Sequence, residues 1–130
     1  MSILYISSYL YISINHYNVA PAMDNYLRLV SALNDPTRIM ILKFLQYYGR
    51  SCVCELQHSF DMGQPRLSRH LKILKDAGLL AARRVGTKVF YSIAPVTAQG
   101  EQLLQTLELV EVRLPRKINH REIRQQKEAA

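Results

Sequence analysis

The sequence predicts a mainly α-helical fold with one small β-hairpin. Apolar residues recur three or four positions apart over most of residues 24–114, as they do in helices with one buried face. Two short apolar runs flank Gly86 and Thr87, which is the pattern of a hairpin. The length of 130 residues, 48% of them apolar, suits one domain with a modest core.

The first two helices are expected over residues 24–33 and 36–48. Asp35 can accept hydrogen bonds from the free N–H groups at the start of the second helix, and Pro36 suits its first turn because no N–H is needed there. The second helix is apolar on most sides, so we expect it at the centre of the core. Gly49 is expected to end it.

Three more helices are expected. One precedes the sequence DMGQP, one follows it, and the last follows the hairpin. A short helix over about 52–60, with Ser51 as its N-cap, contains both cysteines of the chain. A helix over 64–77 has a leucine stripe and a basic opposite face. A last helix is expected over 97–113 and is followed by Pro115.

We divide the chain into three parts. Residues 24–114 form the single domain, and residues 115–130 form a basic tail that we expect to be frayed or disordered. Residues 1–23 contain no Lys, Arg, Asp or Glu, and they lack the basic start of a secretory signal. Three interpretations of this extension stay open: a packed segment, a disordered one, or a start codon assigned too early, since Met23 would suit a start.

Charge is distributed in blocks along the chain. The net charge is +7, yet residues 1–63 carry four basic and four acidic side chains, and residues 64–91 carry seven basic side chains and one acid. A basic block that coincides with one helix and the hairpin indicates a polyanionic partner. The alternative is a solvated basic face without a partner. No run of about 18 uncharged apolar residues is present, so no membrane span is expected.

Two short helices joined by a glycine-containing turn, the second one basic and followed by a basic hairpin, describe a winged helix-turn-helix. The second helix fits the major groove of DNA, where its polar side chains reach base edges, and the hairpin meets phosphates. We expect His70 to pack or touch a phosphate rather than read a base. The candidate DNA-binding residues are Gln64, Arg66, Ser68, Arg69, His70, Lys72, Arg83, Arg84 and Lys88.

The stretches LNDPTRIMILKFL, SCVCEL, QPRLSRHLKILKDAGLL and RRVGTKVFYSI follow one another as in the ArsR/SmtB family of metal-responsive repressors. The sequence resembles this family, and in particular its arsenic-responsive members, over about residues 24–93. The resemblance implies a cytoplasmic, homodimeric repressor of arsenical resistance that binds double-stranded operator DNA, needs no organic cofactor, and releases DNA when metal binds.

The resemblance also implies that the first and last helices form the dimer interface. Both helices carry apolar stripes that suit this role, although the same residues could belong to the core of one subunit, and we expect some of each. The candidate interface residues are Tyr26, Leu29, Leu33, Leu103, Leu107 and Val110.

The two cysteines, Cys52 and Cys54, lie where the resemblance places the sensing cysteines. Thiolates prefer soft, thiophilic ions, and As(III) or Sb(III) prefers two or three sulfurs. On a regular helix, side chains two residues apart point about 200° away from each other. We therefore expect one ion to hold both sulfurs only if the first helical turn distorts, which would shift the recognition helix and release DNA.

Several alternatives to this metalloid site stay open. Some arsenic-responsive relatives have a third cysteine where this chain has Gln57, so the third ligand would be water, an exogenous thiol or an oxygen donor. His58 lies four residues from Cys54 and permits a zinc site, and thiol redox sensing or structural cysteines are further options. An enzyme is disfavoured because no catalytic set appears, and because a CxC pair is expected to close badly into a disulfide. Two cysteines fit a reducing compartment.

Overall fold

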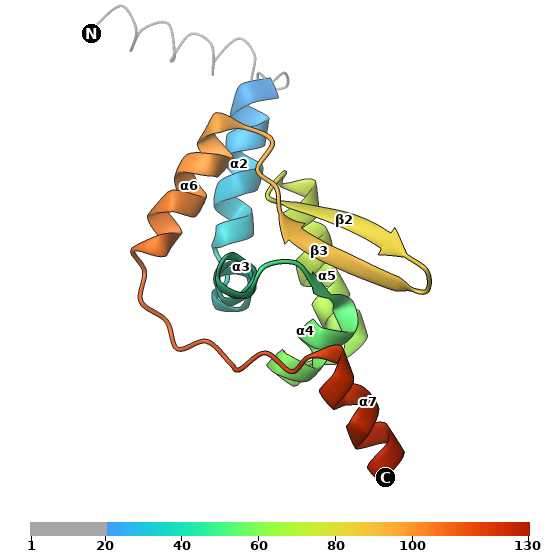
Figure 1. The fold of residues 1–130 in the computed structure, drawn as a ribbon. Helices are drawn as coiled ribbons and strands as arrows, with labels where there is room; N and C mark the ends of the chain where they lie inside the picture. Colours follow the sequence, from blue (N-terminus) through green and yellow to red (C-terminus); the bar gives the residue numbers. More distant parts are fainter. Residues whose placement is uncertain (1–20) are drawn as a thin grey trace, which may run out of the picture.

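The computed structural model describes residues 21–130, so the expectations for the N-terminal extension lie almost entirely outside the described residues. It is mainly helical and has a small sheet, as the sequence predicts (Figure 1). In chain order the elements are α2 Pro21–Leu33, α3 Pro36–Tyr48, β1 Ser51–Cys52, α4 Val53–Phe60, α5 Gln64–Asp76, β2 Leu80–Val85, β3 Lys88–Ile93, α6 Ala98–Glu108 and α7 His120–Ala129.

Helix α3 lies at the centre of the core, and α2, α5 and α6 pack around it (Figure 1). Its residues Ile41, Leu42 and Phe44 are fully buried. The Asp35 carboxylate accepts hydrogen bonds from the N–H groups of Thr37 and Arg38, at 2.8 and 3.2 Å, so the predicted N-cap is confirmed. The helix thus begins and packs as its sequence requires.

The sheet contains the predicted hairpin and one additional short strand. Its strand order is β1-β3-β2, and all pairs are antiparallel. Strand β1 pairs Ser51 with Tyr91 and Cys52 with Phe90. The first cysteine therefore lies in a strand that pairs with the hairpin.

The predicted start of the cysteine-containing helix was wrong by one residue. Ser51 is not the N-cap, because it lies in β1 and donates its hydroxyl hydrogen to the carbonyl of Gly49 at 3.0 Å. Cys52 is the N-cap, with an extended backbone, and its sulfur accepts the N–H of Glu55 at 3.3 Å. Only Cys54 lies inside α4, because pairing with β3 keeps Cys52 extended.

The last predicted helix is shorter than expected. Helix α6 ends at Glu108 rather than near residue 113, well before Pro115. Side chains of α3 bind its final carbonyl groups: the Lys43 ammonium donates to the carbonyl of Leu107 at 2.5 Å, and the Gln46 amide donates to that of Leu104 at 2.9 Å. The Leu107 carbonyl, which a longer helix would pair with residue 111, instead accepts the N–H of Val110 at 3.0 Å as well as the Lys43 hydrogen bond.

The expectation that the basic tail is frayed or disordered was wrong. Residues 120–129 form α7, which begins with a reciprocal capping box between Asn119 and Glu122. Ile123 is only 3% exposed, and α7 packs against α4 (Figure 1). Local capping and one buried anchor thus order a segment whose composition is typical of disorder.

Candidate functional site

The recognition helix presents the predicted polar face. The leucines of α5 are buried on one side, and Gln64, Arg66, Ser68 and Arg69 are exposed on the other. Lys72 lies further along the helix, where its ammonium pairs with Asp76 at 2.8 Å. The first two turns of α5 therefore carry exposed polar and cationic side chains that form no ion pair in the structure described, although Arg69 donates to the carbonyl of Pro65 at 3.4 Å.

The structure separates the two predicted arginines of the wing. Paired residues of neighbouring strands share a face, and successive residues alternate between faces. Arg84 pairs with Val89 and so lies on the same face as Tyr91, whereas Arg83 pairs with Phe90 on the opposite face. Arg84 lines a cavity with both cysteines and the start of α5, whereas Arg83 does not line it.

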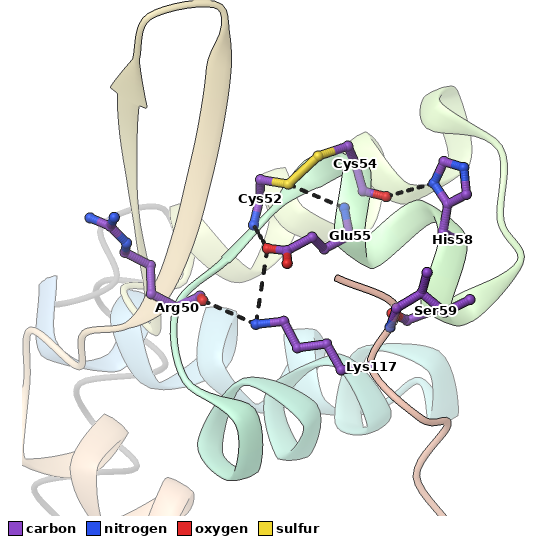
Figure 2. The surroundings of a disulfide bond; sticks show 8 residues. Arg50, Cys52, Cys54, Glu55, His58, Ser59 and Lys117 are labelled. Carbon is purple, nitrogen blue, oxygen red and sulfur yellow. Dashed lines mark hydrogen bonds and ion pairs between the residues drawn. A yellow bond between two sulfur atoms is a disulfide. The ribbon is translucent and has the colours of Figure 1, made fainter. Parts of the chain in front are cut away.

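The two cysteine sulfurs meet and are joined by a disulfide (Figure 2). The Cα atoms of Cys52 and Cys54 are 5.3 Å apart, and α4 keeps its capped first turn. The expectation that the sulfurs converge only when this turn distorts was therefore wrong, as was the expectation that this CxC pair closes badly. The physical reason is that Cys52 has an extended backbone, and residues two apart can share a side where the chain is extended.

A buried carboxylate, that of Glu55, binds the backbone next to the disulfide. Glu55 is 8% exposed, and its Oε1 accepts the N–H of Cys52 at 3.0 Å. The Lys117 ammonium lies 3.9 Å from the same oxygen and donates to the carbonyl of Arg50 at 3.4 Å (Figure 2). Sequence reasoning missed both residues, although the spacing Cys-x-x-Glu is that of a capping box.

Cys52 and Cys54 line a cavity of about 360 Å³, and several of the candidate DNA-binding residues line it too. Three elements form it: the start of α4, the start of α5, and the wing. The lining residues are Cys52, Val53, Cys54, Gln57, Gln64, Ser68, Arg84, Thr87, Lys88, Val89 and Tyr91. The residues predicted to hold a metalloid and several of those predicted to hold DNA thus share one hollow.

His70 lies between the recognition helix and the start of α3. It is half-buried, and its Nδ1 lies 3.4 Å from the guanidinium of Arg38. Arg38 also donates to the carbonyls of Ala32 and Ser31, at 2.7 and 3.2 Å, which links α2, α3 and α5. The His70 ring thus packs between α5 and the start of α3, beside Arg38.

The alternative zinc ligand, His58, bonds within its own helix. Its Nδ1 lies 2.8 Å from the carbonyl oxygen of Cys54 (Figure 2). Among residues 21–130, no three His, Cys, Asp or Glu side chains are grouped as a metal site would require. Within the described residues, His58 thus lies beside its own helix backbone and is not grouped with the two cysteines and a further ligand.

The candidate interface residues divide into two groups. Leu29 and Leu107 are buried within the subunit, and Leu33 and Leu103 are partly buried. Tyr26 is 49% exposed and Val110 is 42% exposed. The exposed stripe of α2 also includes Met23 and Val30. An apolar surface thus remains on α2 and just beyond the end of α6.

A basic recognition helix backed by a core and flanked by a three-stranded wing defines the class of winged helix-turn-helix regulators. Residues 35–82 match the family described as bacterial regulatory protein, arsR family. The chain belongs to this ArsR family. No helix within residues 21–130 combines the length and apolarity needed to cross a membrane.

Individual relatives agree with this family. An uncharacterised HTH-type transcriptional regulator of Methanocaldococcus jannaschii is 48% identical over 65 residues, which are 50% of this chain and 73% of that protein. The arsenical resistance operon repressor of Escherichia coli K12 is 41% identical over 69 residues, 53% of this chain and 59% of the repressor. The chain thus spans about three fifths of that repressor's length.

A solved structure supports the fold. The homodimeric winged helix-turn-helix DNA-binding domain of a possible ArsR-family transcriptional regulator from Mycobacterium bovis matches with a TM-score of 0.61 and 29% identity. The match covers 71% of this chain and 82% of that domain. These relatives are described as regulators of transcription rather than as enzymes.

Proposed function

We propose that this protein is a repressor that binds operator DNA as a homodimer and releases it when As(III) or Sb(III) binds Cys52 and Cys54. The observation that carries the proposal is the shared cavity, because it places both sulfurs beside residues of α5 and the wing. The arsenical resistance repressor of E. coli, 41% identical over the matched region, supports the choice of inducer.

The DNA-binding part of the proposal follows from the exposed face of α5. A two-fold dimer would place two such helices about 34 Å apart, in successive major grooves of one DNA face. Gln64 and Arg66 would reach base edges from the first turn, and the wing cations would meet phosphates. The apolar stripe of α2, together with the homodimeric neighbour, supports the dimer.

The inducer part follows from the chemistry of the sulfur pair. The disulfide must be reduced before the sulfurs can bind a metalloid. Two molecules of a thiol reductant would do this, since they give the two cysteine thiols and are themselves oxidised to a disulfide. As(OH)₃ then exchanges two hydroxides for the sulfurs of Cys52 and Cys54: two As–S bonds form, and each thiol proton leaves with a hydroxide as water. Thiolate sulfur suits such a soft centre better than oxygen does.

Release of DNA then needs no unwinding of α4. A metalloid held at Cys52 and Cys54 occupies the hollow between α5 and the wing, where Gln64 and Arg84 also lie. An occupied cavity would shift these DNA-binding groups relative to each other. Moving the bound fraction from 99:1 to 1:99 requires a difference in binding free energy of about 5.5 kcal/mol between the two states.

The test is a fluorescence anisotropy titration of the reduced protein on a duplex selected by that protein from a random pool. Arsenite should release the wild type, while Cys52→Ser and Cys54→Ser should keep DNA affinity and lose the response. Release of either variant at wild-type arsenite concentrations would contradict the assigned site.

The disulfide favours a second candidate function, a repressor that responds to oxidation. Peroxide would oxidise both thiols to the disulfide and would itself be reduced to two waters. In the same titration, peroxide in place of arsenite separates the two functions. DNA release by peroxide alone, without release by arsenite, would replace the metalloid proposal with the redox one.

A further inference from the structure

We infer that the cavity beside the thiol pair binds a small thiol that carries a carboxylate, and that its sulfur completes the coordination of the metalloid. This inference rests on the proposed function, because it concerns the third ligand at Cys52 and Cys54. It adds a second small-molecule partner to the protein, recognised by charge.

Cys52 and Cys54 supply two of the three bonds that As(III) forms. As(III) forms three bonds, and the cavity lining includes two sulfurs, both already counted. Gln57 lies in the same lining, but its neutral amide is a hard and weak donor for a soft ion. A third sulfur that replaces the remaining hydroxide would therefore have to come from outside the lining of this cavity.

The second step is the size of the space. Sites for small molecules typically measure about 300–1,000 Å³, and the cavity of about 360 Å³ lies at the lower end of that range. It suits a molecule of a few heavy atoms beside the metalloid. Water alone would leave most of this volume without a specific occupant.

The third step is charge. The lining contains the cations Arg84 and Lys88 and includes no carboxylate. A guanidinium binds a carboxylate with two parallel hydrogen bonds, and an ammonium adds a point charge. A thiol whose carboxylate lies two or three bonds from its sulfur could bridge the metalloid and these cations.

The reaction balances without a redox step. The metalloid bound to both cysteines keeps one hydroxide. The incoming thiol gives up its proton to that hydroxide, which leaves as water, and a third As–S bond forms. The carboxylate keeps its charge and pairs with Arg84 and Lys88, which are the groups expected to neutralise DNA phosphates. Binding of the thiol should therefore favour release of DNA.

The experiment uses the full chain reduced with a phosphine, so that no other thiol is present. Arsenite is added, and then either 3-mercaptopropionate or its neutral amide is titrated. X-ray absorption at arsenic counts the sulfur neighbours, and native mass spectrometry detects the thiol adduct. We expect two sulfurs and one oxygen before the titration. We expect three sulfurs at a mercaptopropionate concentration at least about tenfold below that needed for the amide, because one charge-assisted hydrogen bond alone supplies that factor and the carboxylate can make more than one.

Two variants assign the selectivity to the cavity. Arg84→Gln with Lys88→Gln should remove the preference for the acid, whereas Arg83→Gln, on the other face of β2, should keep it. Equal titrations of acid and amide on the wild type, or a third ligand that stays oxygen, would overturn the inference alone. Arsenic without two protein sulfurs before any thiol is added would instead overturn the proposed function.

Discussion

Gly78 joins the recognition helix to the wing in a conformation that other residues rarely adopt. Its φ is +76°, and a Cβ placed there would lie 2.5 Å from Cγ2 of Val96. Its carbonyl also accepts the N–H of Val96 at 3.0 Å, so the two segments are held close. Backbone strain and a steric clash therefore coincide at this single position.

We predict that Gly78→Ala lowers the free energy of unfolding by roughly 1–3 kcal/mol, the cost of placing a residue with a side chain in a left-handed conformation. Urea denaturation measures it. Gly86→Ala is the matched control, because φ is +62° but the new Cβ meets nothing within 4 Å. Equal losses in the two variants would show that the contact with Val96 contributes nothing.

His70 gives a second prediction at this scale. Burial lowers the pKa of His70 below its ordinary value of 6.5; the Asp35 carboxylate opposes this shift, and neighbouring arginines add to it. As pH falls through 6.5, the unfolded chain binds a proton before the folded chain does. The free energy of unfolding should therefore fall between pH 6.5 and the lowered pKa, and this histidine should contribute nothing above that window.

Denaturation at a series of pH values checks this prediction. A His70→Gln variant keeps a polar side chain that does not titrate, so its stability should depend less on pH within this window than that of the wild type. Identical pH profiles for the two proteins would mean that His70 titrates alike in the folded and unfolded chains.

At the scale of an element, α7 and the segment before it attach the C-terminal tail to α4. The segment before α7 makes two interactions with α4. The N–H of Ile118 donates to the Ser59 hydroxyl at 2.9 Å, and the Lys117 ammonium lies 3.9 Å from the Glu55 carboxylate. Arg116 pairs with Glu122 at 2.8 Å and closes the turn into the helix. The tail thus contacts α4 through Ser59 and Glu55, which do not line the cavity.

We predict that Ile123→Asp detaches α7 while the core stays folded, because Ile123 is the buried residue of that helix. Hydrogen exchange should show fast exchange of the backbone N–H groups of residues 120–129 and unchanged protection in α3. Arg124→Asp, an exposed neighbour, is the control. Retained protection of α7 in the Ile123 variant would contradict its docking.

Strand β1 and helix α7 are the two elements that the sequence does not predict. The Asp35 and Pro36 cap, the leucine stripe of α5 and the Gly86 turn are local signals, and the structure follows them. Strand β1 is two residues long and depends on Phe90 and Tyr91, which lie far along the chain, so no local pattern shows it. This one strand changed the state of Cys52 from helical to extended, and with it the geometry of the site.

The sequence does not predict helix α7 for another reason. Its composition is charged and polar, which is typical of disorder. The capping-box spacing of Asn119 and Glu122 is visible in the sequence, but one apolar residue does not reveal the surface against which it packs. The docking site on α4 exists only in the folded molecule.

At the scale of the whole molecule, the exposed apolar stripe of α2 is the surface expected to pair two subunits. Tyr26→Asp together with Val30→Asp should give a monomer in analytical ultracentrifugation, because two charges would be buried without partners at the interface. DNA affinity should fall with it, while circular dichroism stays that of a folded protein. Tyr47→Asp, on an exposed position of α3, is the control. A variant that remains dimeric would exclude this stripe as the interface.

The most direct test of the account is the arsenite titration of the reduced protein bound to its selected duplex. The wild type should leave the DNA as arsenite is added, and Cys52→Ser and Cys54→Ser, with equal initial affinity, should stay bound. A wild-type complex that persists in arsenite, or serine variants that dissociate as readily, would contradict it.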